Sequence, residues 1–146
     1  MKHRLFTALG LTAWLLLALA PAAALAADPA PAARAPQRVV FQVNEDDSRK
    51  WNTVLANINN VQEELGKVEI TVVAIGPGLG MLKADALTAN GVQDAMAAGV
   101  RFVACGNTMK SLNLSKDDMI DGIGYARAGY VEVMRLQQQG HAYLRP

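Results

Sequence analysis

The fold of this chain is decided by residues 100–108, which read Val-Arg-Phe-Val-Ala-Cys-Gly-Asn-Thr. The apolar part of this stretch ends at Gly106 and is too short for a helix, so it suits a buried strand. Gly106 permits a sharp turn, and Asn107 and Thr108 are residue types whose side chains cap the first N–H groups of a helix. We therefore predict a strand, a turn and a helix start, with Cys105, the chain's only cysteine, at the strand end.

A cysteine at such a junction faces the unpaired amides and the positive dipole end of a helix. Both favour the thiolate over the thiol, and the thiolate is the nucleophilic form of cysteine. The alternative is a small, buried and inert cysteine, because free cysteine is often fully buried. The local sequence leaves both interpretations of Cys105 open.

The N-terminus has the pattern of a secretory signal peptide over residues 1–26. A positive head is followed by an apolar core at residues 5–20 and by a small-residue tail that ends Ala-Leu-Ala. A retained membrane anchor is the alternative. We expect cleavage after Ala26, a periplasmic protein, and no membrane contact after cleavage. Residues 27–37 contain three prolines and are predicted to be a disordered linker.

Charge and cysteine content narrow the function. The whole chain has a net charge of +1, and removal of Lys2 and Arg4 leaves 12 basic against 13 acidic residues, a net charge of −1. Such a domain, which has no basic cluster, is a poor nucleic-acid binder. A single cysteine cannot form an internal disulfide in an oxidising compartment. It is therefore buried, paired between chains, or kept for its reactivity.

Residues 38–146 are predicted to form one α/β domain, because strand patterns alternate with helical ones. We expect five strands, over residues 39–43, 68–75, 100–104, 123–126 and 142–144. We expect helices over residues 51–65, 88–98 and 129–138, the first marked by apolar residues at spacings of three and four. We expect helical turns over 108–112 and over 115–120, where Ser-Lys-Asp-Asp at 115–118 has a reciprocal capping pattern. This order indicates a mostly parallel five-stranded sheet with helices on both faces and with the last strand at an edge.

Strands that precede crossovers end at the same edge of a parallel sheet, where ligand sites of open α/β sheets form. The segments 44–48, 76–80 and 105–108 should therefore gather at that edge. We predict Cys105 as the catalytic residue, with these substrate-binding residues around it: Gly106, Asn107, Thr108, Asn44, Gly76, Pro77 and Gly78.

Other chemistries fit the sequence less well, and we predict neither a cofactor nor a metal. The glycine segment, Gly-Pro-Gly-Leu-Gly at 76–80, is predicted to be a loop after the second strand. It fails the dinucleotide fingerprint because the third glycine position holds Met81. The acids of residues 45–47 precede a helix, where they offset its dipole, and no histidine lies at ligand spacing. His141 could act as a base for Cys105. We expect it instead to be a surface residue, since nothing places it near the cysteine.

The order of motifs resembles the DsrE/DsrF-like family over essentially the whole mature chain. The matching segments are Val-Val-Phe-Gln-Val-Asn-Glu-Asp-Asp at 39–47, residues 51–60, Gly-Pro-Gly at 76–78, Gly-Val-Arg-Phe at 99–102 leading to Ala-Cys-Gly-Asn-Thr at 104–108, and residues 138–146. The resemblance implies a five-stranded, largely parallel sheet and assembly into trimers or hexamers. The sulfur-relay members of the family have a cysteine that carries sulfane sulfur as a persulfide. The resemblance implies by position that this cysteine is Cys105.

Three functions follow as hypotheses. The first is a periplasmic sulfur-carrier or sulfurtransferase-like protein that exchanges sulfur with a donor or acceptor protein, although the relay members are cytoplasmic and this chain has an export signal. The second is a non-catalytic oligomeric module for small-molecule binding or interaction, in which Cys105 is structural. The third is redox sensing through a mixed disulfide.

Overall fold

The computed structural model describes residues 36–146. The predicted signal peptide and all but the last two residues of the predicted linker lie outside the described residues. The helices, strands and 3₁₀ helices (η) follow one another as β1 (Gln37–Val43), α1 (Ser48–Leu65), β2 (Val68–Ala74), η1 (Gly76–Leu82), α2 (Ala89–Ala97), β3 (Arg101–Cys105), α3 (Gly106–Ser111), η2 (Lys116–Asp118), β4 (Gly124–Ala126), α4 (Gly129–Gln138) and β5 (Ala142–Leu144).

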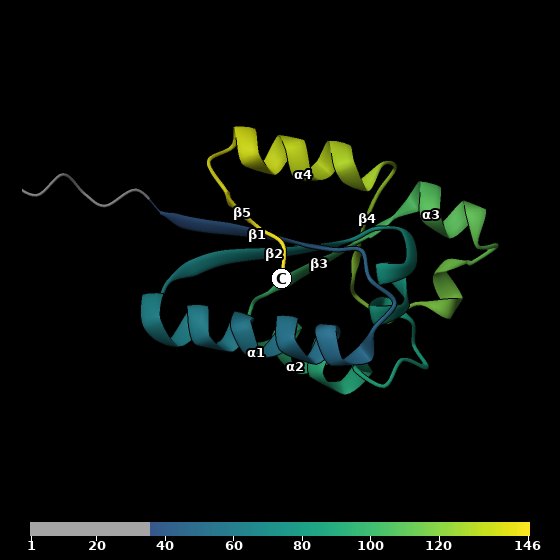
Figure 1. The fold of residues 1–146 in the computed structure, drawn as a ribbon, viewed down its shortest axis with the longest axis horizontal. Helices are drawn as coiled ribbons and strands as arrows, with labels where there is room; N and C mark the ends of the chain where they lie inside the picture. The colour runs from purple at the N-terminus through teal and green to yellow at the C-terminus, as the bar shows by residue number, and fades with distance from the viewer. Residues whose placement is uncertain (1–35) are drawn as a thin grey trace, which may run out of the picture. The chain divides into compact units, whose positions relative to one another are not determined.

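The sheet has five strands in the order β4-β3-β2-β1-β5, and every neighbouring pair is parallel. The helix α4 covers one face, and α1 and α2 cover the other (Figure 1). The predicted α/β architecture is therefore confirmed, including β5 as an edge strand. None of the helices within residues 36–146 is long and apolar enough to cross a membrane.

Alternation along the strands decides which side chains meet which helices. Phe41, Val72 and Phe102 belong to the core on the side of α1 and α2. Their neighbours at odd spacing point the other way, and Val103 and Cys105 pack against α4. Because the period of a strand is two, the sequence position of Cys105 places its side chain on the α4 face.

The longest helix, α1, forms where the apolar spacing predicts it. Its buried side consists of Trp51, Val54 and Ile58. The Asp47 carboxylate accepts a hydrogen bond of 2.9 Å from the Arg49 N–H, which satisfies one free amide of the first turn. Of the acids at residues 45–47, Asp47 therefore serves as the cap of this helix.

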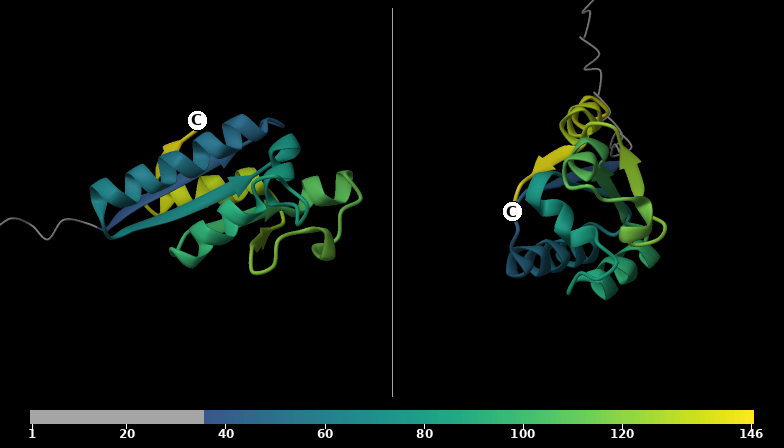
Figure 2. Two further views of the ribbon diagram at one scale, coloured as in Figure 1. Left: turned by 90° about the horizontal axis from the view of Figure 1, so that it is seen from below. Right: turned by 90° about the vertical axis from the view of Figure 1, so that its right-hand side faces the viewer.

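The glycine segment is more ordered than the predicted loop. Residues Gly76–Leu82 form η1, with Leu79, Met81 and Leu82 fully buried. Its Gly78 lies against the end of β1, and the Gly78 N–H donates to the Asn44 carbonyl at 3.0 Å. The segment thereby joins the carboxyl ends of β1 and β2 (Figure 2).

Candidate functional site

Cys105 is the last residue of β3 and lies directly before α3. Its side chain points toward the start of α4, and the Gly129 N–H donates a hydrogen bond to Sγ at 3.2 Å. The residue is only 4% exposed. Gly129 is 24 positions away in sequence, so this donor comes from the tertiary fold.

The surroundings of Cys105 favour its ionised form. Burial raises the pKa of the thiol. The Thr108 hydroxyl and the main-chain N–H groups of Gly129, Thr108 and Asn107 act against burial and leave the pKa below its ordinary value. Hydrogen bonds to a charged form stabilise that form, so the thiolate fraction at neutral pH is increased.

The predicted capping roles of Asn107 and Thr108 are wrong. The helix begins at Gly106, ahead of both residues, so Cys105 occupies the cap position and makes no side-chain cap bond. The Thr108 hydroxyl instead accepts a hydrogen bond of 2.9 Å from the Gly76 N–H. The same hydroxyl therefore ties η1 to α3 and favours the Cys105 thiolate.

The sulfur borders a cavity of about 280 Å³. This cavity is lined by Ile75, Cys105, Asn107, Thr108, Ser111, Ala128, Gly129 and Tyr130. Cys105 is thus buried from bulk solvent, yet it faces a space with polar groups on several sides. This arrangement differs from a thiol enclosed by hydrocarbon.

The predicted site residues gather at one edge of the sheet but have different places there. Cys105, Asn107 and Thr108 line the cysteine cavity, whereas Gly76 and Pro77 line a neighbouring cavity of about 740 Å³. Thr108 and Ser111 border both cavities, so a single wall separates them.

The remaining predicted residues support this edge from outside the cysteine cavity. Gly106 packs against β4, since a Cβ there would lie 3.3 Å from the Ala126 carbonyl oxygen. Gly78 is buried beneath the end of β1. Asn44 reaches the cavity indirectly, because its side chain donates to the Tyr130 hydroxyl at 3.0 Å.

The start of α4 supplies site residues that the sequence patterns did not reveal. A Cβ at Gly129 would lie 2.6 Å from Ile75 Cγ1 and 3.1 Å from Cys105 Cβ. Glycine therefore allows the helix to approach the sulfur closely. Gly129 and Tyr130 open a predicted helix, but only the packing of α4 across the sheet brings them to Cys105.

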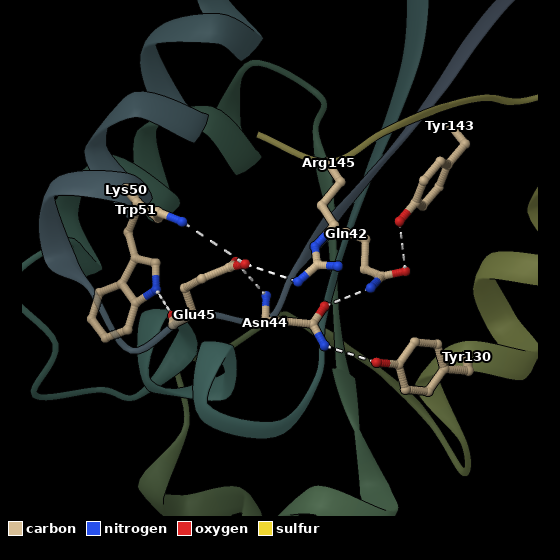
Figure 3. A network of polar contacts seen from close by, with 8 residues as sticks. All are labelled: Gln42, Asn44, Glu45, Lys50, Trp51, Tyr130, Tyr143 and Arg145. Carbon is tan, nitrogen blue, oxygen red and sulfur yellow. Dashed lines mark hydrogen bonds and ion pairs between the residues drawn. The ribbon is translucent and has the colours of Figure 1, made fainter.

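A network of polar side chains surrounds the end of β1 (Figure 3). The Glu45 carboxylate pairs with Arg145 at 3.0 Å, and Lys50 lies 3.9 Å away. The hydrogen bond from Arg145 is the main cause that lowers the pKa of Glu45. The Glu45 carboxylate therefore binds basic residues of this chain. Within residues 36–146 no group of three or more His, Cys, Asp or Glu side chains is arranged to hold a metal ion.

His141 is buried, so its predicted surface position is wrong. The residue is 5% exposed, with Nδ1 2.9 Å from the Leu136 carbonyl oxygen and Nε2 3.5 Å from the Glu69 carboxylate. These contacts lie at the C-terminal end of α4, whereas Cys105 contacts its first residue. His141 is therefore at the opposite end of the sheet and is no base for Cys105.

Comparison with known proteins agrees with this architecture. The model of the DsrE/DsrF-like family matches residues 37–146. A solved protein of unknown function from Methanobacterium thermoautotrophicum is 34% identical, with a TM-score of 0.74 over 75% of this chain and 99% of that one. No curated protein matches the chain.

Two further solved structures share the fold at low identity. The ychN protein of E. coli is 14% identical, with a TM-score of 0.63 over 75% of this chain and 99% of its own. A conserved protein of unknown function from Bacteroides thetaiotaomicron is 13% identical, with a TM-score of 0.63 over 75% of this chain and 95% of its own.

Proposed function

The chain belongs to the DsrE/DsrF-like family, and from this we propose that it is a sulfur carrier in which Cys105 holds sulfane sulfur as a persulfide. One observation carries the proposal. The thiol has a lowered pKa and borders a cavity large enough for a small sulfur compound. Family membership supports sulfur chemistry in general, and this cysteine supplies the atom for it.

The transfer step needs no oxidant or reductant beyond the sulfur donor. The Cys105 thiolate attacks the outer sulfur of a persulfide R–S–SH, and a new bond forms between Sγ and that sulfur. The S–S bond of the donor breaks, and the donor leaves as the thiolate R–S⁻ with the electron pair of that bond. The product on the protein is Cys105–S–SH. The N–H group of Gly129 and the Thr108 hydroxyl, which favour a negative sulfur, would stabilise the anionic form of this product.

Mass spectrometry of the purified protein after incubation with polysulfide tests the proposal. We expect the mass to increase by whole sulfur atoms, the added sulfur to map to the peptide with Cys105, and dithiothreitol to restore the original mass. Cys105→Ser is the matched control and should gain nothing. An unchanged mass in the wild type, or equal addition to the serine variant, would contradict the proposal.

A structural cysteine in a non-catalytic binding module is the second candidate, and the low exposure of Cys105 favours it. The two candidates differ in thiol accessibility. In a carrier the thiol reacts in the folded protein, whereas a packed structural thiol reacts only after unfolding.

Export to the periplasm is a further part of the proposal, supported by the signal-peptide pattern of residues 1–26. We expect N-terminal sequencing of the protein from a periplasmic fraction to start at Ala27. Recovery of the uncleaved chain from the cytoplasm would contradict this expectation. Assembly into a trimer or hexamer likewise stays a prediction.

A further inference from the structure

A series of hydrogen bonds runs from Tyr143 on the edge strand β5 to Tyr130 (Figure 3), a residue that lines the cysteine cavity. The Tyr143 hydroxyl donates to Gln42 Oε1 at 3.1 Å, and Gln42 Nε2 donates to Asn44 Oδ1 at 2.6 Å. Asn44 Nδ2 then donates to the Tyr130 hydroxyl at 3.0 Å. Each group donates to the next, so Tyr130 is the final acceptor.

The direction of these hydrogen bonds leaves the hydroxyl hydrogen of Tyr130 free. A phenol both accepts and donates, and the Tyr130 hydroxyl is used here only as an acceptor. Its own hydrogen makes no contact with the described residues. Because Tyr130 lines the cavity of Cys105, this hydrogen is available to a molecule that enters the cavity.

Tyr130 is 60% exposed, and its hydroxyl is positioned by Asn44, whose own surroundings are fixed. Gln42 is 5% exposed on the α4 face of β1, and the Asn44 carbonyl accepts from the Gly78 N–H at 3.0 Å. Tyr130 also directly follows Gly129, whose N–H contacts the sulfur of Cys105. The Gly129 N–H that contacts the sulfur and the Tyr130 side chain are therefore adjacent at the start of α4.

Resting on the proposed function, we propose that Tyr130 contacts and selects the sulfur donor, and that this donor is a short inorganic polysulfide anion. The phenol O–H donates a hydrogen bond to the anionic end of the sulfur chain, while the aromatic ring narrows the cavity. A cavity of about 280 Å³ lies just below the usual size of about 300–1,000 Å³ for sites of drug-sized ligands. An unbranched chain of a few sulfur atoms fits this size better than a bulky organic persulfide.

The Tyr130 phenol also assists the step in which an S–S bond of the polysulfide is cleaved. The Cys105 thiolate attacks a sulfane sulfur of the polysulfide and forms one S–S bond, while the next S–S bond of the chain breaks. The shorter polysulfide leaves as an anion with the electron pair of that bond. A hydrogen bond from the Tyr130 O–H to this developing negative charge stabilises the transition state more than the ground state.

Three variants of the full protein separate the effect of the Tyr130 hydroxyl from that of its aromatic ring. Tyr130→Phe removes only the hydroxyl, and Tyr130→Ala removes the ring as well. Tyr125→Phe is the matched control, since Tyr125 lies on β4 and does not line the cysteine cavity. Two rates are measured for each variant, namely sulfur loading from inorganic polysulfide and alkylation by iodoacetamide, a small neutral reagent that reports the thiolate alone.

We expect Tyr130→Phe to load sulfur about tenfold more slowly, as the loss of a hydrogen bond to a charged group implies, with unchanged alkylation. Tyr130→Ala should load polysulfide at least as slowly, but should react faster than wild type with a bulky aromatic disulfide. Tyr125→Phe should match the wild type in every rate.

Other outcomes overturn the inference in distinguishable ways. Wild-type loading by Tyr130→Phe would show that the hydroxyl has no part in the reaction. An equal fall in loading and alkylation would mean that Tyr130 acts on the thiolate or on folding. If the wild-type protein alkylates but never loads sulfur, the sulfur-carrier function itself fails, and the choice of donor falls with it.

Discussion

Gly78→Ala is expected to lower the free energy of unfolding by about 3 kcal/mol or more, at or above the upper end of what overpacking costs. A Cβ at this position would lie 2.3 Å from the Val43 carbonyl oxygen and 2.8 Å from the Asn44 main-chain N. Both obstacles are backbone atoms, so no side-chain rotation relieves the overlap. The end of β1 must move, and the hydrogen bond from the Gly78 N–H to Asn44 is lost with it.

Urea denaturation followed by circular dichroism measures this effect. Gly124→Ala is the matched control, because its Cβ would meet the Phe102 carbonyl oxygen at 3.4 Å, an ordinary contact. We expect the control to stay within about 1 kcal/mol of the wild type. Equal stability of the two variants would show that the close approach of η1 to β1 is not needed for the fold.

Thr108→Val is expected to raise the pKa of Cys105 and therefore to slow its alkylation at neutral pH. While the thiol form predominates, the alkylation rate falls about tenfold for each unit by which the pKa rises. Burial raises the pKa of this thiol, and the Thr108 hydroxyl is the foremost of the groups that lower it. Valine keeps the shape of threonine but removes that hydroxyl. In the wild type the thiolate is lost as the pH falls through the lowered pKa, so the rate profile of the variant should move to higher pH.

Iodoacetamide alkylation across a pH series measures the shift. Thr108→Ser keeps the hydroxyl and should retain the wild-type profile, and Thr53→Val on the exposed side of α1 should leave it unchanged. Thr108→Val also deprives the Gly76 N–H of its acceptor, so its folding is checked by circular dichroism. A profile that does not move would contradict the role of Thr108. A thiol that reacts only after unfolding would favour the structural cysteine instead.

The sequence predicted the main elements because their signals are local. Apolar alternation marked the strands, spacing of three and four marked α1, and the capping pattern at Ser115 marked η2, whose capping box is present. The glycine segment was misjudged as a loop. Its 3₁₀ helix depends on contacts with distant residues, such as Trp51 against Gly80, and no local pattern reports those contacts.

The site was predicted only in part for the same reason. Cys105 at the end of a strand could be found from its own neighbours, and so could the sheet edge at which it lies. Tyr130 could not, because its role depends on Asn44, which is 86 positions away. His141 resembled a surface residue because the groups that bury it, such as Glu69 on β2, are distant in sequence.

The sequence by itself determined the order of strands and helices along the chain, the position of Cys105 at a strand end, and the family to which the chain belongs. Those features follow from hydrophobic periodicity and turn residues, which act over a few positions. Only the tertiary structure decided that the sulfur receives hydrogen bonds and borders a cavity. The groups responsible come from α3, the start of α4 and the end of β2, and only packing across the sheet brings such distant segments together.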